Sequence, residues 1–258
     1  MILKQSKIYF HVGTGKTGST FLQTRIFPLL KGINYIPTNR YYKIFQEIKK
    51  YPNTTILVSR EFDQQLEREV KLFSEKHPNT TAIIVFRRHD SYIASQYRRF
   101  VKNGFTGKFQ SFFDLKNNNG YFKKEDLDYK KQVELLKKYF TQKPIVFIYK
   151  DFKKNPYLFI HKWVKIMNSS LESEKVNWKK KHTSYSEHQL NIIMQFSKII
   201  NLKKRRVFKK NILHFLWKIY LGSIRYSILY LSFLLPKNNK ELISQEELEA
   251  VKIHFKKD

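Results

Sequence analysis

The sequence KIYFHVGTGKTGST, residues 7–20, decides the fold. Its first half, Lys7–Val12, is an apolar run typical of a buried β-strand, and glycines, a lysine and several hydroxyl side chains follow it directly. Gly18–Leu30 then repeats apolar residues at helical spacing. A strand that leads through such a loop into a helix predicts a phosphate cradle, because backbone N–H groups and a lysine ammonium attract an anion.

Strand-like and helix-like segments alternate along the chain after this loop. Short apolar runs predict further strands over Ile33–Ile36, Thr54–Ser59, Thr81–Phe86 and Ile145–Tyr149. Helical patterns cover Asp63–Lys76, Ser91–Lys102, Asp126–Phe140 and Pro156–Met167. Asn103–Gly120, which is rich in Asn and Gly, is predicted to be a long loop. The alternation predicts an α/β fold, with a P-loop-like parallel sheet flanked by helices on both faces.

The pattern changes in the last third of the chain. Gln189–Ile200 predicts a helix, and the basic run Lys203–Lys210 follows it. Ile212–Leu235 is strongly apolar and aromatic. Ser244 and Glu247 have capping-box spacing and predict the start of a helix. We therefore expect an α/β core over residues 1–200 and a basic, helical C-terminal segment over residues 201–258.

The glycine loop is not a regular Walker A nucleotide-binding loop, although GTGKT resembles one. That motif has a glycine five residues before its Gly-Lys pair, and Phe10 stands there. The residues directly after the strands Thr54–Ser59 and Thr81–Phe86 also lack the aspartate that a phosphoryl-transfer enzyme needs for Mg²⁺. A P-loop nucleotide kinase is therefore kept only as an alternative.

A second motif follows the strand predicted over Thr81–Phe86. Arg87 stands at the end of this strand, and Ser95 comes eight residues later in the next helix. Together with Gly-x-x-Lys-Thr-Gly-Ser-Thr, which ends at Thr20, this pair resembles the two anion motifs of sulfotransferases that use 3′-phosphoadenosine 5′-phosphosulfate (PAPS). In that family the first motif binds the 5′-phosphosulfate and the second binds the 3′-phosphate. The likeness covers residues 5–200.

The resemblance implies a set of site residues. PAPS, or its product PAP, would contact Gly15, Lys16, Thr17, Gly18, Ser19, Thr20, Arg87 and Ser95. Lys16 would stabilise the charge that develops on the bridging oxygen, and Glu61, just after a strand, would take the proton of the acceptor. His11 and His182 are alternatives for the base, although a strand position makes His11 more typical of a structural residue. No metal is expected to be required, because no His/Asp/Glu cluster has ligand spacing.

The acceptor is implied only in broad terms. Because the resemblance is closer to bacterial and glycan-type members, we expect a hydroxyl or amine of a glycan or glycolipid-type molecule. The short apolar stretch at the N-terminus contains His11 and does not look like a signal peptide, so a cytoplasmic protein is expected.

The composition excludes several classes of protein. The 258 residues include 50 Lys and Arg, 21 Asp and Glu, and no Cys, so the formal net charge is +29. A hydrophobic content of 41% is too high for a disordered basic tail. Without Cys, disulfides, zinc–thiolate sites and a cysteine nucleophile are excluded.

The net positive charge favours anionic partners, so a non-enzymatic module that binds nucleic acid or membrane is a second alternative. It leaves both anion motifs unexplained, and no nucleic-acid partner is expected. A Lys-rich coding bias supplies part of the charge.

The most localised excess of charge lies in residues 188–240, which hold eleven Lys and Arg and no Asp or Glu. Within them, Trp217–Leu235 is about as long as a membrane span needs, but Arg225 near its centre disfavours a full span. Two possibilities stay open. Either an interfacial helix makes peripheral contact with an anionic membrane, or a C-terminal helix packs on the core beside a basic acceptor site.

Overall fold

A computed structural model describes residues 6–179, 185–202, 208–236 and 240–258. The chain forms two compact units. Unit 1 consists of Met1–Arg88, Glu125–Lys181 and Asp258, and unit 2 of His89–Lys124 and His182–Lys257. The predicted boundary near residue 200 stays a prediction.

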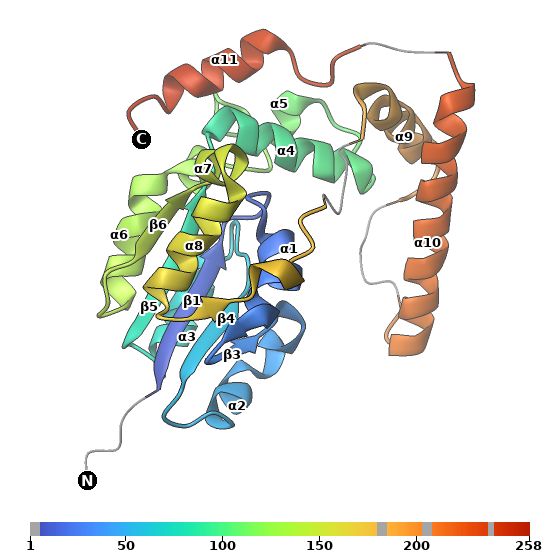
Figure 1. The fold of residues 1–258 in the computed structure, drawn as a ribbon. Coiled ribbons are helices and arrows are strands. Elements are labelled where there is room, and N and C mark those ends of the chain that lie inside the picture. Colours follow the sequence, from blue (N-terminus) through green and yellow to red (C-terminus); the bar gives the residue numbers. More distant parts are fainter. Residues whose placement is uncertain (1–5, 180–184, 203–207, 237–239) are drawn as a thin grey trace. The chain divides into compact units, whose positions relative to one another are not determined.

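Unit 1 is built on a parallel five-stranded sheet with the strand order β3-β4-β1-β5-β6. The strands are β1 (Lys7–Gly13), β3 (Ile33–Ile36), β4 (Thr55–Ser59), β5 (Thr80–Phe86) and β6 (Ile145–Ile148). All four pairings within this sheet are parallel, and β1 lies at the centre (Figure 1). Because parallel strands all end at the same edge, the segments that follow β1, β4 and β5 emerge together. The five predicted strands are therefore confirmed within one residue at each end.

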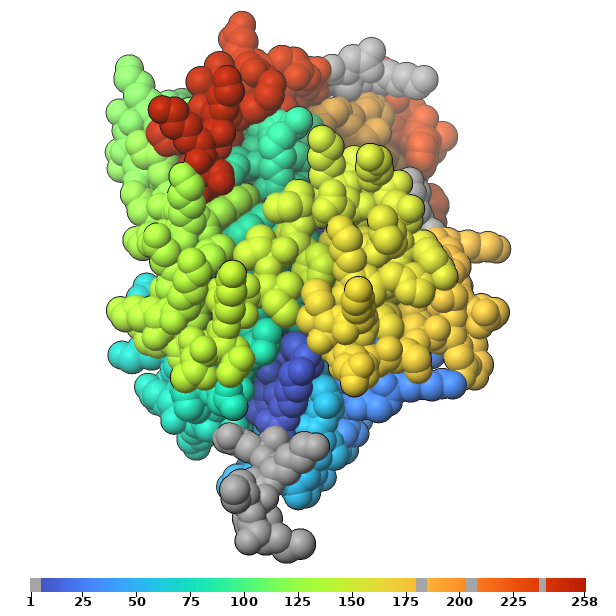
Figure 2. All heavy atoms as spheres, turned by 60° about the vertical axis from the view of Figure 1, so that its left-hand side comes forward, coloured from blue at the N-terminus to red at the C-terminus, as the bar shows by residue number. Residues whose placement is uncertain are grey.

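Helices cover both faces of the sheet, and alternating strand side chains supply a core on each face. On one face Phe10 and Val58 pack with α2 (Ile44–Lys49), α3 (Leu66–Ser74) and α6 (Tyr129–Tyr139). On the other face, side chains of the N-terminal helical segment and of α8 (Pro156–Ile166) complete the core. Figure 2 shows the β6 side of this unit, where the light-green to yellow segments form the surface. The expected α/β class, with helices on both faces, is confirmed.

The helix after the glycine loop differs from a regular α-helix. It begins as α1 (Ser19–Phe21), continues as a π-helical segment (Leu22–Ile26) and ends as a 3₁₀ turn (Phe27–Leu29). Pro28 lies in that final turn, where it removes a backbone donor and fixes the local dihedral angle. The predicted helix exists over this range, but with changing hydrogen-bond spacing.

Smaller elements complete unit 1. They are the antiparallel pair β2 (Leu30–Lys31) and β7 (Ser170–Leu171), helix α7 (Tyr149–Lys154), and 3₁₀ turns at Thr38–Lys43, Lys124–Leu127 and Ser173–Lys175. The turn over Lys124–Leu127 spans the point where the chain returns from unit 2.

Unit 2 is helical in its described parts. It contains α4 (His89–Lys102), α5 (Phe109–Phe112), α9 (Glu187–Ile199), α10 (Asn211–Leu231), a 3₁₀ turn (Ser232–Leu234) and α11 (Gln245–His254). Capping boxes begin α9 at Ser186 and α11 at Ser244, so the predicted box at Ser244 and Glu247 is confirmed. The prediction of a structureless loop over residues 103–120 was incomplete, because an aromatic cluster orders α5 within it. Phe112 packs against Tyr97 and Phe100 of α4.

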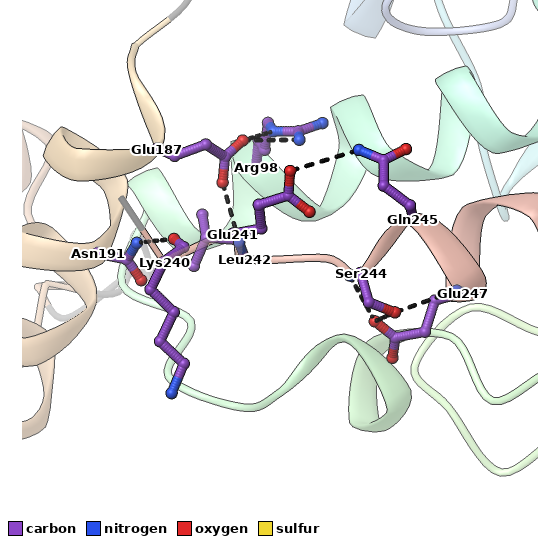
Figure 3. Close-up of polar contacts among 9 residues, drawn as sticks. All are labelled: Arg98, Glu187, Asn191, Lys240, Glu241, Leu242, Ser244, Gln245 and Glu247. Atoms are coloured by element: carbon purple, nitrogen blue, oxygen red, sulfur yellow. Dashed lines mark hydrogen bonds and ion pairs between the residues drawn. The ribbon is translucent and has the colours of Figure 1, made fainter. Parts of the chain in front are cut away.

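A half-buried hydrogen-bond network around the Glu187 carboxylate joins three segments of unit 2 (Figure 3). Glu187 accepts from Arg98 Nε at 2.7 Å with one oxygen and from the backbone N–H of Leu242 at 3.0 Å with the other. Asn191 Nδ2 donates to the Lys240 carbonyl at 2.6 Å. These bonds connect α4, α9 and the segment before α11. Glu187, which accepts two of them, directly precedes residues 188–240, which contain no Asp or Glu.

Candidate functional site

The glycine loop runs from Gly13 to Gly18 between β1 and α1. Gly13 has φ 142°, and a Cβ there would lie 2.9 Å from the Phe62 carbonyl oxygen. Gly18 has φ 84°, and a Cβ there would meet the Phe152 ring at 2.8 Å. Both positions therefore require glycine for backbone conformation and for space. The loop is held tightly between the segment after β4 and helix α7.

Lys16 lies at the tip of the loop in a strained conformation. Its φ of 66° falls in the left-handed region, which costs a residue with a Cβ about 1–2 kcal/mol. Strain of this kind persists where surrounding contacts enforce it, and it concentrates at functional sites. One such contact is visible, because Arg87 Nη1 donates to the Lys16 carbonyl at 3.0 Å. Two of the predicted site residues, 71 positions apart, are thus in direct contact.

Arg87 is held from several sides. The Tyr129 hydroxyl donates to its backbone carbonyl at 2.6 Å, and the Tyr129 ring stacks on Phe86 with the ring centroids 4.1 Å apart. The Arg87 guanidinium lies over the Tyr149 ring, 5.2 Å from its centroid, in a cation–π contact. The start of α6 therefore holds the backbone of Arg87, and Tyr149 at the start of α7 contacts its guanidinium.

Two hydroxyl groups of the loop donate to backbone carbonyls of the protein. Thr14 Oγ1 donates to the Val85 carbonyl at 3.0 Å, and Thr17 Oγ1 donates to the Thr14 carbonyl at 2.6 Å. Ser19 is buried, with its Oγ 3.4 Å from that of Thr17, whereas Thr20 is exposed. The Thr17 hydroxyl therefore already donates its proton within the loop. An anion bound here would be held by backbone N–H groups and lysine rather than by that hydroxyl.

Two carboxylates follow β4 on the same edge. The Asp63 carboxylate accepts from the Gly15 backbone N–H at 3.3 Å, which means that this loop attracts a negative group of the protein itself. Glu61 is half-buried. Burial, and to a smaller extent the negative charge of Glu61, raise the pKa of Tyr35 above its usual range. The buried Tyr35 hydroxyl has no partner within the described residues.

His11 is a structural residue, as its strand position predicts. Its Nδ1 lies 2.8 Å from Ser59 Oγ, which also accepts from Gln23 Nε2 at 3.0 Å. The ring packs edge-on against Phe27 and Trp163. Complete burial lowers the pKa of His11 to about 3, so the imidazole is neutral at physiological pH. It is enclosed by the core and has no access to an acceptor.

The remaining predicted residues have different outcomes. Ser95 is half-buried on α4 of unit 2, and its pairing with Arg87 stays a prediction. His182 lies outside the described residues. Asp63, Tyr35 and Tyr129 were not expected at this site from the sequence. Asp63 stands two residues after Glu61, so its position after a parallel strand was a usable signal. Tyr129 is 42 residues from Arg87, and no local pattern links the two.

The described residues contain no group of three or more His, Cys, Asp or Glu side chains arranged to hold a metal ion. Within the same residues, no helix combines the length and the apolar character that crossing a membrane requires.

Comparison with solved structures identifies the fold. A sulfotransferase from Alicyclobacillus acidocaldarius has a similar structure, with a TM-score of 0.54 and 13% sequence identity. The similarity covers 73% of this chain and 91% of that protein. No model of a known family matches the sequence, and no curated protein matches it either. The chain therefore shares the α/β fold of that sulfotransferase despite a very different sequence.

Proposed function

We propose that the protein is a sulfotransferase that moves a sulfuryl group from PAPS to a hydroxyl or amine of a glycan or glycolipid-type acceptor. The bond between Arg87 Nη1 and the Lys16 carbonyl carries this proposal. It joins two motifs that each have the chemistry of an anion site, at the edge where open α/β sheets bind ligands. The fold shared with a sulfotransferase supports the same function.

The charge and the hydrogen-bond donors of this edge suit the donor. Backbone N–H groups of Gly15–Thr20 and the Lys16 ammonium would hold the 5′-phosphosulfate, and Lys16 would stabilise charge on the bridging oxygen. The Arg87 guanidinium offers a planar fork to the 3′-phosphate, with Ser95 as a further donor. Asp63 now accepts from the Gly15 N–H, so we infer that its carboxylate turns away when a phosphate takes this donor.

Glu61 is the proposed base. It follows β4 on the same edge as the loop, and it is half-buried. A carboxylate here would take the proton of an acceptor hydroxyl as the sulfuryl group arrives. His11 is unsuitable because it is enclosed in the core.

One observation keeps a nucleotide kinase as the second candidate. Asp63 brings a carboxylate to the loop, and an aspartate near phosphates is what Mg²⁺ requires. The missing glycine at Phe10 still disfavours a Walker A loop. The alternative of a protein that only binds nucleic acid does not explain why Lys16 and Arg87 are in contact.

Thermal denaturation with different nucleotides tests the proposal. PAP, AMP and ATP with Mg²⁺ are compared at equal concentrations. AMP is the matched control, because it lacks only the 3′-phosphate. A ligand present at one hundred times its Kd adds about 2.7 kcal/mol, and each kcal/mol raises the Tm of a chain this size by about 2–4 °C. We expect PAP to give the largest shift. A larger shift from ATP with Mg²⁺ contradicts the proposal and favours the kinase.

A further inference from the structure

Helix α10 presents an unusual face to the rest of unit 2. Its buried positions are Leu221, Arg225, Ile228 and Leu229, and the buried Ser232 continues this face. Arg225 Nη2 donates to the Leu202 carbonyl, and burial lowers the pKa of this guanidinium below its usual range. The side of α10 that packs on the protein therefore includes a cation and a hydroxyl.

The opposite face of α10 is apolar and exposed. Its large side chains are Ile212, Phe215, Ile219, Tyr226 and Tyr230, with exposed fractions of 76, 62, 50, 55 and 73%. Successive members of this set are three, four or seven residues apart, so they form one stripe along the helix. A helix on the surface of a protein in water normally has the reverse arrangement, with its apolar stripe inside. The stripe thus indicates a medium or partner that is itself apolar.

The apolar surface extends beyond this stripe. Beside it, Ile219, Gly222, Ser223, Tyr226 and Tyr230 contribute to a shallow hollow of about 770 Å³. A second hollow of about 530 Å³ lies between α9 and α10, which run next to each other over the C-terminal half of α10 (Figure 1). Exposed Phe196 (39%), Ile200 (39%) and Leu234 (80%) line this second hollow. A contiguous apolar surface of this kind marks an interaction site.

Every Lys, Arg, Asp or Glu in the stretch of sequence that forms this patch is a Lys or an Arg. Residues 188–240 contain eleven Lys and Arg and no Asp or Glu. Lys198, Lys209, Lys210 and Lys218 are exposed on or next to α9 and α10. Two copies of this chain would bring like charges together if they paired through this face. An anionic partner with an apolar interior satisfies both features.

We propose that α10, together with the exposed apolar residues of α9, lies in the interface of an anionic lipid bilayer. Phe215, Ile219 and Leu234 would enter the region between headgroups and acyl chains, while tyrosines occupy the headgroup level that aromatic side chains prefer. The flanking lysines would contact anionic headgroups. Arg225 points to the protein side and so avoids the lipid. This surface binding is independent of the proposed sulfuryl transfer.

Vesicle co-sedimentation of the full chain tests this proposal. The wild type is mixed with vesicles of phosphatidylserine and phosphatidylcholine, or of phosphatidylcholine alone, at moderate salt. We expect pelleting with the anionic vesicles only, and less of it as salt rises. The variant Phe215→Ser/Ile219→Ser should weaken binding to anionic vesicles by at least about tenfold, because two apolar side chains no longer enter the lipid.

A matched control is Leu72→Ser/Leu158→Ser, which removes two exposed leucines of unit 1 with exposed fractions of 49 and 54%. It should bind vesicles like the wild type, and circular dichroism checks that both variants keep their helices. A wild type that stays in the supernatant with anionic vesicles overturns the proposal. So does equal binding by the α10 variant. Sedimentation velocity adds a third outcome: a dimer that Phe215→Ser/Ile219→Ser dissociates, without vesicle binding, assigns the face to a second copy instead.

Discussion

The glycine loop of unit 1 holds its positive charge at fixed points, whereas the region around α10 spreads positive charge over a surface. In the loop, hydrogen bonds and ring contacts position Lys16 and Arg87. Residues 188–240, which include α10 and its exposed apolar face, contain eleven Lys and Arg and no Asp or Glu. Fixed charges recognise the geometry of one ligand, while a spread charge recognises only the sign of its partner. One substitution should therefore matter far more in the loop than on the surface.

The largest effect is expected from Lys16→Ala. If Lys16 stabilises the bridging oxygen, its loss should lower turnover by about 10²–10³-fold, as for the loss of one oxyanion donor. Sulfur-labelled PAPS with a carbohydrate acceptor extract measures the transfer.

The matched control for this variant is Lys137→Ala, an exposed lysine on α6 of the same unit. It should retain wild-type turnover within about twofold, since an exposed charge contributes little. An equal loss of turnover in Lys16→Ala and Lys137→Ala would mean that the loop acts only through the overall positive potential of the protein. The contrast between fixed and spread charge would then be wrong.

A smaller decrease in turnover is expected from Glu61→Gln. The amide keeps the size of the side chain but accepts no proton, so kcat should fall by about 100-fold while PAP affinity is retained. Glu134→Gln, an exposed site on α6, serves as the control. Near-normal kcat in folded Glu61→Gln would remove Glu61 as the base. It would leave a surface carboxylate that pairs with nearby charges.

The fold was largely predictable because the deciding signals are local. Each strand of the sheet is a short apolar run, and the glycine loop follows the first one directly. The Ser244 capping box is equally local and begins α11 as expected. Helix α5 was not predictable, because contacts of Phe112 with α4, rather than its own sequence, order this segment.

The sequence predicted that Lys16 and Arg87 belong to one site, but it did not predict the residues that hold them in place. The motif gave Lys16 and Arg87, yet the bond between them depends on sheet topology and on a left-handed lysine. Tyr129 enters from a distant helix, so no spacing rule identifies it. The orientation of α10 was hidden for another reason: its sequence is apolar almost all round. The burial of Leu221, Arg225 and Leu229 in the structure shows which side faces the protein.

The smallest of these effects, and the sharpest division of roles, is expected from Arg87→Ala. As a ligand of the 3′-phosphate, Arg87 should contribute about 1.5–3 kcal/mol, so PAP affinity should fall by roughly 10–150-fold while AMP affinity is unchanged. As a support of the loop through the Lys16 carbonyl, it should weaken PAP and AMP equally. Isothermal titration with both nucleotides separates these roles, with exposed Arg88→Ala as the control. An equal loss for both nucleotides removes Arg87 as a phosphate ligand and makes it a positioning residue. Lys16 would then be the one positioned charge of the loop that binds the ligand. The contrast with the charged surface of α10 would rest on that single side chain.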